Sequence, residues 1–238
     1  MSDSFFSRSG ALHRRTFLRV AGASAATASL VLAGCSDTEP TPVVVDPNLL
    51  QLAQADPGLL NYLYLLKQLQ TAFYQKVVDA FPSDFSAAEK LAFNDLRDHE
   101  LVHRETLRFM LGANAYDTAL LQPLPFDFSS LTLTSRAGVL AGAQQLEDLS
   151  VAAYAGSLRL LAAVPTAALL AKIASVEARH AAFVRDLRTP GSFADTDVVV
   201  SEGALQSVSL AKTPTQVLDE TKAFFLPVVV SPSSLPTA

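Results

Sequence analysis

Two short segments of the chain repeat the pattern Glu-x-x-His. They run from Glu100 to His103 and from Glu177 to His180, and each lies in a long stretch of periodic apolar residues without Gly or Pro. On a helix, residues three apart share a face, so each carboxylate and its imidazole point the same way. Four-helix bundles hold dinuclear metal centres with pairs of this kind. The chain has only four histidines, so finding two of them in this pattern favours a metal site.

Three glutamates fall on apolar stripes of predicted helices. A buried carboxylate without a partner costs several kcal/mol, so three of them in one core require cations. Carboxylate oxygens and imidazole nitrogens suit iron, manganese or zinc. For a single motif, an exposed ion pair with Arg104 or Arg179 is the alternative. The stripes are Phe93, Leu96, Glu100, His103, Leu107 and Met110; Leu140, Ala143, Glu147, Val151, Tyr154 and Leu158; and Leu169, Ile173, Glu177, His180, Val184 and Leu187.

Lys67 stands where a fourth carboxylate is expected. Glu147 precedes Tyr154 by seven residues, and Lys67 precedes Tyr74 by the same interval. Four glutamates would balance two divalent ions, whereas three glutamates and one ammonium sum to −2, which balances one. We therefore expect the Lys67 ammonium to replace part of the charge of one metal, unless its amine reaches solvent at the bundle end.

The expected ligands divide into two halves. One half is complete, with Glu147, Glu177 and His180 as ligands and Glu100 as a bridge. The other half has Glu100 and His103 facing a lysine instead of a glutamate. The site is therefore predicted to hold iron or manganese, with zinc as an alternative, and one ion rather than two.

Two tyrosines follow the same spacing. Tyr74 and Tyr154 are either plain core residues or hydrogen-bond donors to the ligand carboxylates. His99 is predicted to lie on the surface, because it is about a quarter-turn of helix away from Glu100.

Four long helices are predicted to position these residues, at about 56–80, 86–111, 135–163 and 165–187. Asp56 is the predicted N-cap of the first, and Ser86 opens the second with a capping box to Glu89. The first two helices and the last two are joined by short loops, so each pair is expected to be antiparallel. Residues 113–134 form one long connection, and two hairpins joined by one crossover are the ferritin-like arrangement.

The flanking segments carry weaker patterns. Leu49 to Ala55 is expected to form a short lead-in helix, and Asp197 to Ser201 an extended piece. Pro214 to Phe225 is predicted as a fifth helix, with Thr213 or Thr215 at its cap. Residues 227–238 are expected to be a loose tail. The predicted fold class is all-α, a ferritin-like four-helix bundle with a long crossover between helices two and three and a short C-terminal helix.

At these residues the chain resembles the ferritin-like domain family of exported bacterial proteins, which includes relatives described as desiccation-related. The resemblance covers about Leu49 to Leu226 and implies a carboxylate-bridged di-metal site, from which Lys67 departs. It names no substrate. The matching stretches are Asn61 to Tyr64, Ala72 to Tyr74, Asp98 to His103, Leu146 to Asp148, Ala153 to Tyr154, and Val176 to His180.

The N-terminal segment, residues 1–34, is similar to a twin-arginine lipoprotein signal peptide. It contains Arg14 and Arg15, then an Ala-rich run too short to span a bilayer, and ends before Cys35 in a lipobox-like Leu-Ala-Gly. Cys35 is the only cysteine, so lipidation is expected and a disulfide within the chain is excluded. Residues 35–48 are the expected lipidated tether.

The net charge of the chain limits the classes of binding partner that we expect. Removing residues 1–34 changes the net charge from −5 to −8, because they carry four Arg and one Asp. An acidic chain without a basic cluster argues against nucleic-acid binding. We expect a membrane-anchored lipoprotein of the bacterial cell envelope, on its periplasmic or surface side. Protein partners stay open, with a homodimer as one alternative.

Two functions follow from these patterns. The first is a metal-binding protein with redox or metal-handling activity, which includes a single-metal or di-metal oxidoreductase. The second is a non-catalytic structural or stress-related lipoprotein whose degenerate site holds no metal. Iron storage in a closed cage is disfavoured, since every subunit would carry a lipid anchor and a tether.

Overall fold

The structure is a computed structural model, and it describes residues 48–120 and 122–237. The predicted signal peptide with Arg14 and Arg15, the lipidation site Cys35 and the tether up to residue 47 lie outside the described residues. The described residues belong to one compact unit.

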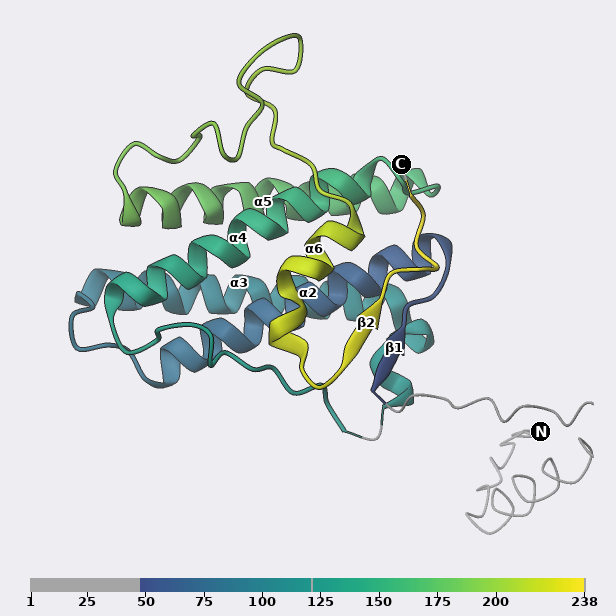
Figure 1. The fold of residues 1–238 in the computed structure, drawn as a ribbon, viewed down its shortest axis with the longest axis horizontal. Helices are drawn as coiled ribbons and strands as arrows, with labels where there is room; N and C mark the ends of the chain where they lie inside the picture. The colour runs from purple at the N-terminus through teal and green to yellow at the C-terminus, as the bar shows by residue number, and fades with distance from the viewer. Residues whose placement is uncertain (1–47, 121, 238) are drawn as a thin grey trace, which may run out of the picture. The chain divides into compact units, whose positions relative to one another are not determined.

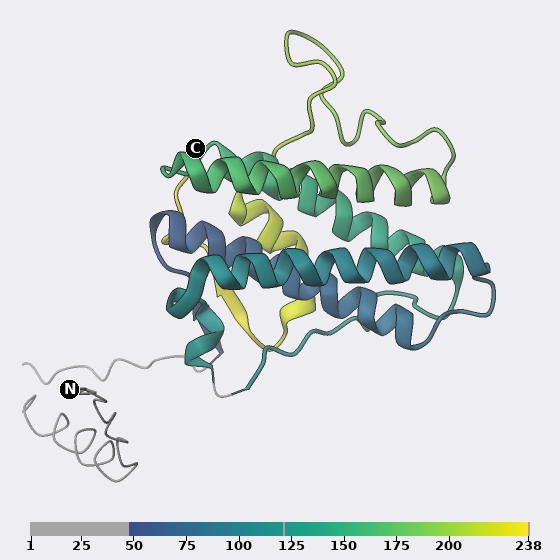
Figure 2. The ribbon, with the colours of Figure 1, turned by 180° about the vertical axis from the view of Figure 1, so that it is seen from behind.

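Four long helices carry the fold, as predicted (Figure 1). Helix α2 packs along α3 and α4 packs along α5, and the two hairpins meet where α2 contacts α4. Figure 2 shows α3 and α5 on one side of the bundle, with α2 and α4 behind them. The all-α ferritin-like architecture is thus confirmed. The helices are α2 (Ala55–Asp79), α3 (Ala87–Leu111), α4 (Arg136–Leu158) and α5 (Val164–Arg188).

Helix ends agree with the sequence patterns at some positions and differ at others. Ser86 and Glu89 form the predicted capping box, and Gly112 follows the end of α3 with φ of 54°, a conformation that glycine adopts without strain. Helix α4 ends at Leu158, five residues before the predicted end at Ala163.

Asp56 is not the N-cap that the sequence predicted. It lies inside the first turn of α2, whose N-cap is Gln54. Its carboxylate instead accepts backbone N–H groups of Ala162 and Ala163, both at 2.9 Å, at the start of α5. Asp56 therefore fixes the backbone that leads into α5, whose N-cap Ala163 provides no side-chain cap.

The crossover between the hairpins runs from residue 112 to residue 135 and includes two short 3₁₀ helices, η1 (Gly112–Asn114) and η2 (Tyr116–Ala119). The Asn61 side chain of α2 anchors it, donating to the carbonyl of Asn114 and accepting from the backbone N–H of Tyr116. The crossover is therefore fixed on the helix that carries Lys67.

The segments that flank the bundle pair with each other. Leu49–Gln51 is strand β1, not a lead-in helix, and it pairs in parallel with β2 (Val229–Ser231). The expected loose tail is therefore ordered at this point, and Leu235 beyond it is buried. The β-branched Val229 and Val230 favour an extended strand, and both Val230 and Leu50 pack against the core.

The C-terminal helix is shorter than predicted. Helix α6 (Pro214–Thr221) begins after the N-cap Thr213 and continues as the 3₁₀ helix η3 (Lys222–Phe225). Its side chains close the bundle against α4. The predicted extended piece at residues 197–201 contributes only an isolated bridge from Val199 to Ser209.

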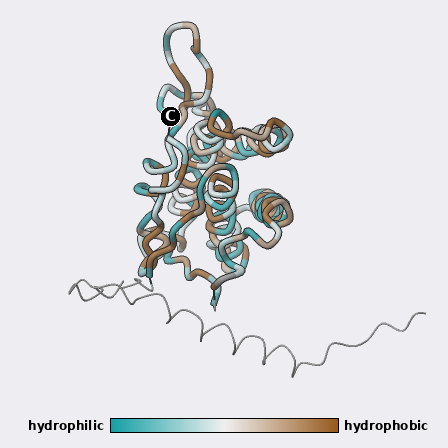
Figure 3. Tube along the Cα trace, turned by 90° about the vertical axis from the view of Figure 1, so that its right-hand side faces the viewer, coloured by the Kyte–Doolittle hydropathy of each residue, from teal (hydrophilic) through white to brown (hydrophobic). Residues whose placement is uncertain are grey.

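The core lies between the four long helices. Figure 3 views these helices nearly end-on and shows hydrophobic and hydrophilic segments interleaved along them. Large side chains such as Tyr62, Phe73 and Phe93 are fully buried there. One predicted stripe is shifted at its start, because Leu170 is buried whereas Leu169 is 36% exposed.

Candidate metal centre

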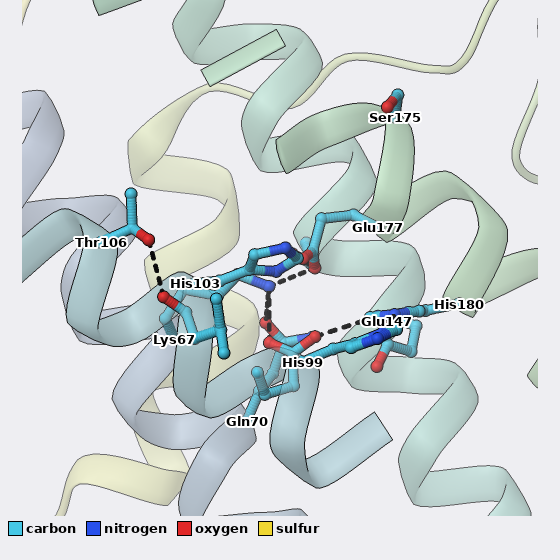
Figure 4. A network of polar contacts seen from close by, with 12 residues as sticks. Lys67, Gln70, His99, His103, Thr106, Glu147, Ser175, Glu177 and His180 are labelled. Atoms are coloured by element: carbon cyan, nitrogen blue, oxygen red, sulfur yellow. Dashed lines mark hydrogen bonds and ion pairs between the residues drawn. The ribbon is translucent and has the colours of Figure 1, made fainter. Parts of the chain in front are cut away.

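A buried lysine lies at the centre of the bundle. The Lys67 ammonium, on α2, donates to Glu100 of α3 at 2.8 Å, to Gln70 at 2.7 Å and to Glu177 of α5. Lys67, Glu100 and Glu177 are all fully buried, so the amine does not reach solvent. The lysine therefore joins the two Glu-x-x-His motifs (Figure 4).

The two motifs also cross-pair. His103 Nδ1 donates to Glu177 Oε1 at 2.7 Å, and His180 Nδ1 lies 3.1 Å from Glu100 Oε1. Each imidazole thus contacts the glutamate of the other motif, on the other helix. The helical spacing puts each pair on one face, and the packing of α3 beside α5 brings the two faces together.

Glu147 of α4 completes the group. Its Oε1 accepts a hydrogen bond from the Tyr74 hydroxyl at 2.6 Å, and its Oε2 lies 3.9 Å from His180 Nδ1. Glu147 is fully buried, yet Oε2 has no hydrogen-bond partner among the described residues. Ligand atoms from Glu100, Glu147, Glu177 and His180 all lie within 4.8 Å of one another. This group of four can hold a metal ion.

The electrostatics of the site are set by burial and by Lys67. Burial raises the pKa of Glu147 well above its ordinary value, and repulsion from Glu100 and Glu177 adds to the effect. Burial also acts to raise the pKa of Glu177, but Lys67 and His103 outweigh it and hold that pKa well below the ordinary value. Burial acts to lower the pKa of Lys67, but the three carboxylates raise it overall.

The comparison with known protein families agrees with this geometry. The family described as "Ferritin-like domain" matches residues 55–190, more than half of the chain. The chain belongs to the ferritin-like domain family. A search of curated proteins found no match. None of the helices within residues 48–120 and 122–237 is long and apolar enough to cross a membrane.

Within this ferritin-like bundle, the predicted site residues are brought together unequally. Glu100, Glu147, Glu177 and His180 form the group of four, which corresponds to the half-site expected to be complete, with Glu100 joining it. His103 is buried beside this group, but its Nδ1 donates a hydrogen bond to Glu177. Lys67 takes the place of the fourth carboxylate.

The two tyrosines differ. Tyr74 donates to a candidate ligand, as the sequence allowed. Tyr154 is equally buried, but its hydroxyl has no hydrogen-bond partner among the described residues. Its ring faces the Lys67 ammonium at 5.6 Å instead. Of the two alternatives that the sequence left open for Tyr154, the structure agrees with the plain core residue and not with a hydrogen bond to a ligand carboxylate.

Sequence reasoning missed three polar neighbours. Ser150 donates to Glu177 at 2.7 Å, Gln70 accepts from Lys67, and His99 lies 3.0 Å from His180. His99 is on the surface, as predicted, yet its Nδ1 contacts the outer nitrogen of His180. The sequence did contain an indication that His99 lies near the site, because it stands four residues before His103, and residues four apart share a helix face.

A groove opens onto the site between α3 and α5. It has a volume of about 590 Å³ and is lined by the three described histidines and by apolar side chains such as Val102, Val176 and Phe183. Figure 4 shows the three histidines close to Glu147 and Glu177. Small molecules in solvent can therefore approach the outer edge of His180.

Proposed function

We propose that this protein binds one divalent metal ion in the core of a ferritin-like bundle and uses it in redox or metal-handling chemistry. The observation that carries the proposal is Oε2 of the buried Glu147, which has no hydrogen-bond partner within residues 48–120 and 122–237 and lies close to ligand atoms of Glu100, Glu177 and His180. A buried polar atom without a hydrogen-bond partner calls for a ligand, a water or an ion.

The donor set fits a hard or borderline metal. Three carboxylates and one imidazole suit iron or manganese, with zinc as an alternative. Tyr74 orients Glu147, while Ser150 and Lys67 hold Glu177, so the ligands are positioned by hydrogen bonds of their own. A bound iron or manganese ion would supply a redox-active centre to which the groove gives access.

Lys67 supports one ion rather than two. Its ammonium contacts Glu100 and Glu177, the carboxylates that a second metal would share. Three carboxylates and one ammonium leave a charge of −2, which one divalent ion neutralises. The lysine therefore acts as a fixed substitute for part of the charge of the second ion.

A second function is favoured by the same lysine. Lys67, His103 and His180 already give Glu100 and Glu177 hydrogen-bond partners, so much of the network closes without a metal. In that case the protein is a non-catalytic structural lipoprotein, and its degenerate metal site serves as a buried polar network.

The metal content of the purified chain separates the two functions. The full-length chain, prepared without chelator, should contain about one iron, manganese or zinc ion. Lys67→Glu restores the fourth carboxylate and should raise the content towards two, whereas Lys76→Glu, on the exposed side of the same helix, should not. A wild-type chain that holds no metal, and whose melting temperature does not rise when metal is added, favours the structural function.

The cellular setting is a further part of the proposal. We infer that Arg14 and Arg15 direct export and that Cys35 carries the lipid that anchors the protein to the cell-envelope membrane. Cys35→Ala should move the protein from the membrane fraction to the soluble fraction of the envelope. Arg14→Lys with Arg15→Lys should leave it inside the cell.

A further inference from the structure

The contact between His99 and His180 has a restrictive geometry. The ring nitrogens His99 Nδ1 and His180 Nε2 are 3.0 Å apart, the ring centroids are 5.3 Å apart, and the planes are inclined by 15°. Each nitrogen lies at a fixed distance from the centre of its own ring. Two imidazole rings whose centroids are 5.3 Å apart therefore cannot bring their nitrogens closer than about 3.0 Å. The nitrogens therefore point straight at each other along the line between the ring centres.

This geometry defines a hydrogen bond and excludes a chelate. Metal–imidazole bonds are about 2.0 Å long, so an ion between two nitrogens on one line needs more room than 3.0 Å. One nitrogen carries a hydrogen and the other accepts it. The state of His180 Nε2 is thus tied to His99, on the neighbouring helix α3.

The state of Nε2 decides which side of His180 can bind a metal. A neutral imidazole carries one hydrogen, so a free lone pair on Nδ1 requires the hydrogen to be on Nε2. His180 Nδ1 is the nitrogen that faces the carboxylates, 3.1 Å from Glu100 and 3.9 Å from Glu147. With an ion on Nδ1, the hydrogen that Nδ1 gives to Glu100 in the metal-free network lies on Nε2 instead, and His99 Nδ1 is in line to accept it.

We propose that His99 is a positioning residue for the metal centre: by accepting the Nε2 hydrogen of His180, it holds that imidazole in the tautomer and orientation in which Nδ1 can bind the ion. This rests on the proposed metal binding. His103 has no such support, since among the described residues the only hydrogen bond of its side chain is the one from Nδ1 to Glu177.

The position of His99 makes the inference testable without damage to the fold. His99 is exposed and lines the groove, and its contact with His180 is the one side-chain hydrogen bond found for it among the described residues. Val102 lines the same groove, is 61% exposed and lies three residues along the same helix. Val102→Ala is therefore a matched control that removes side-chain volume from the groove but no hydrogen bond.

The experiment measures Zn²⁺ affinity of the full-length chain by competition with a chromogenic chelator. His99→Ala should weaken binding by about 10–100-fold. His99→Gln, whose side-chain oxygen is an acceptor, should recover part of the loss, and Val102→Ala should bind like the wild type. If wild type binds Zn²⁺ and His99→Ala binds it equally well, the role of His99 is overturned while the metal site stands. If the wild type binds neither Zn²⁺, Fe²⁺ nor Mn²⁺, the proposed function itself fails.

A second measurement reports the tautomer directly. In ¹⁵N-labelled, zinc-loaded protein, the His180 ring should carry its hydrogen on Nε2 and the metal on Nδ1. Loss of His99 should expose that hydrogen to solvent exchange. A zinc-loaded His180 with its hydrogen on Nδ1 would contradict the proposal, whatever the affinity.

Discussion

The Lys67 ammonium on α2 donates to Glu100 on α3 at 2.8 Å, and neither side chain is exposed to solvent. The same ammonium contacts Glu177 on α5. One cation therefore links the two Glu-x-x-His motifs and stands between carboxylates that would otherwise repel each other in a dry interior. The stability of the metal-free protein should depend on it.

Replacing Lys67 with methionine tests this dependence. Lys67→Met keeps most of the length of the side chain but leaves Glu100 and Glu177 buried without their cation, which should lower the free energy of unfolding by about 3–5 kcal/mol. Urea unfolding in the presence of chelator at neutral pH measures the change. Lys76→Met, an exposed position on the same helix, should change stability by less than about 0.5 kcal/mol.

Added metal should act differently on the two lysine variants. If the glutamates are metal ligands, Fe²⁺, Mn²⁺ or Zn²⁺ should restore much of the stability that Lys67→Met lost, because a divalent ion replaces the missing charge. Lys76→Met should respond no more than the wild type. Equal stability of Lys67→Met and wild type without metal would show that the ammonium does not hold the site together.

The two core tyrosines give a second, paired prediction. Tyr74→Phe removes the only hydrogen bond to Glu147 Oε1 found among the described residues, so it should cost about 1–3 kcal/mol in the metal-free protein. Tyr154→Phe removes a hydroxyl that has no partner in the described part of the chain and should be close to neutral. Thermal and urea unfolding of both variants compare the effects, and losses of the same size would contradict the distinction between them.

Local patterns explain what the sequence predicted well. The capping box of Ser86 and Glu89, and the three-residue spacing of each Glu-x-x-His pair, depend only on helical geometry. Lys67 was found by an internal repeat of seven residues, which again needs no tertiary information. These features fixed the helices, the inward face of the glutamates and the lysine among them.

Contacts between distant residues explain what the sequence did not predict. The hydrogen bond from Ala163 N–H to Asp56 and the pairing of β1 with β2 join residues more than a hundred positions apart. The bond from His99 to His180 depends on the spacing between α3 and α5, which helical periodicity does not set. Such contacts arise from how the helices and strands pack against each other, so no local sequence pattern predicts them.

Asp56 itself yields a third prediction. Asp56→Ala leaves two backbone N–H groups at the start of α5 without their acceptor and should cost about 0.5–2 kcal/mol of stability. Asp56→Asn keeps one oxygen acceptor and should lose less. Urea unfolding ranks the three proteins. The two ligands on α5, Glu177 and His180, lie in the middle of that helix, so the metal content should be unchanged. A large loss of metal in Asp56→Ala would contradict a role limited to the start of α5.

Glu147 and Glu177 should give the metal-free protein opposite responses to pH. The pKa of Glu147 is raised above the ordinary 4.5 by burial and by its neighbouring carboxylates, so the folded protein holds this proton more tightly than the unfolded chain. The contribution of Glu147 to stability therefore falls as pH rises above about 4.5, by up to about 1.4 kcal/mol per pH unit. The pKa of Glu177 is lowered, so its contribution is present above 4.5 and is lost as pH falls.

Two matched variants isolate these contributions. Glu147→Gln stays neutral and can still accept a hydrogen bond from Tyr74. Its free energy of unfolding should therefore rise steadily relative to that of the wild type as pH rises from about 4.5 towards 7. Glu177→Gln removes a carboxylate paired with Lys67 and His103, so it should be less stable than the wild type by a constant amount above about pH 4.5, and this difference should shrink as the pH falls below 4.5. Urea unfolding with chelator at several pH values gives both differences. A Glu147→Gln difference that stays constant with pH would mean that Glu147 ionises in the fold as easily as in the unfolded chain, and that its burial needs no cation.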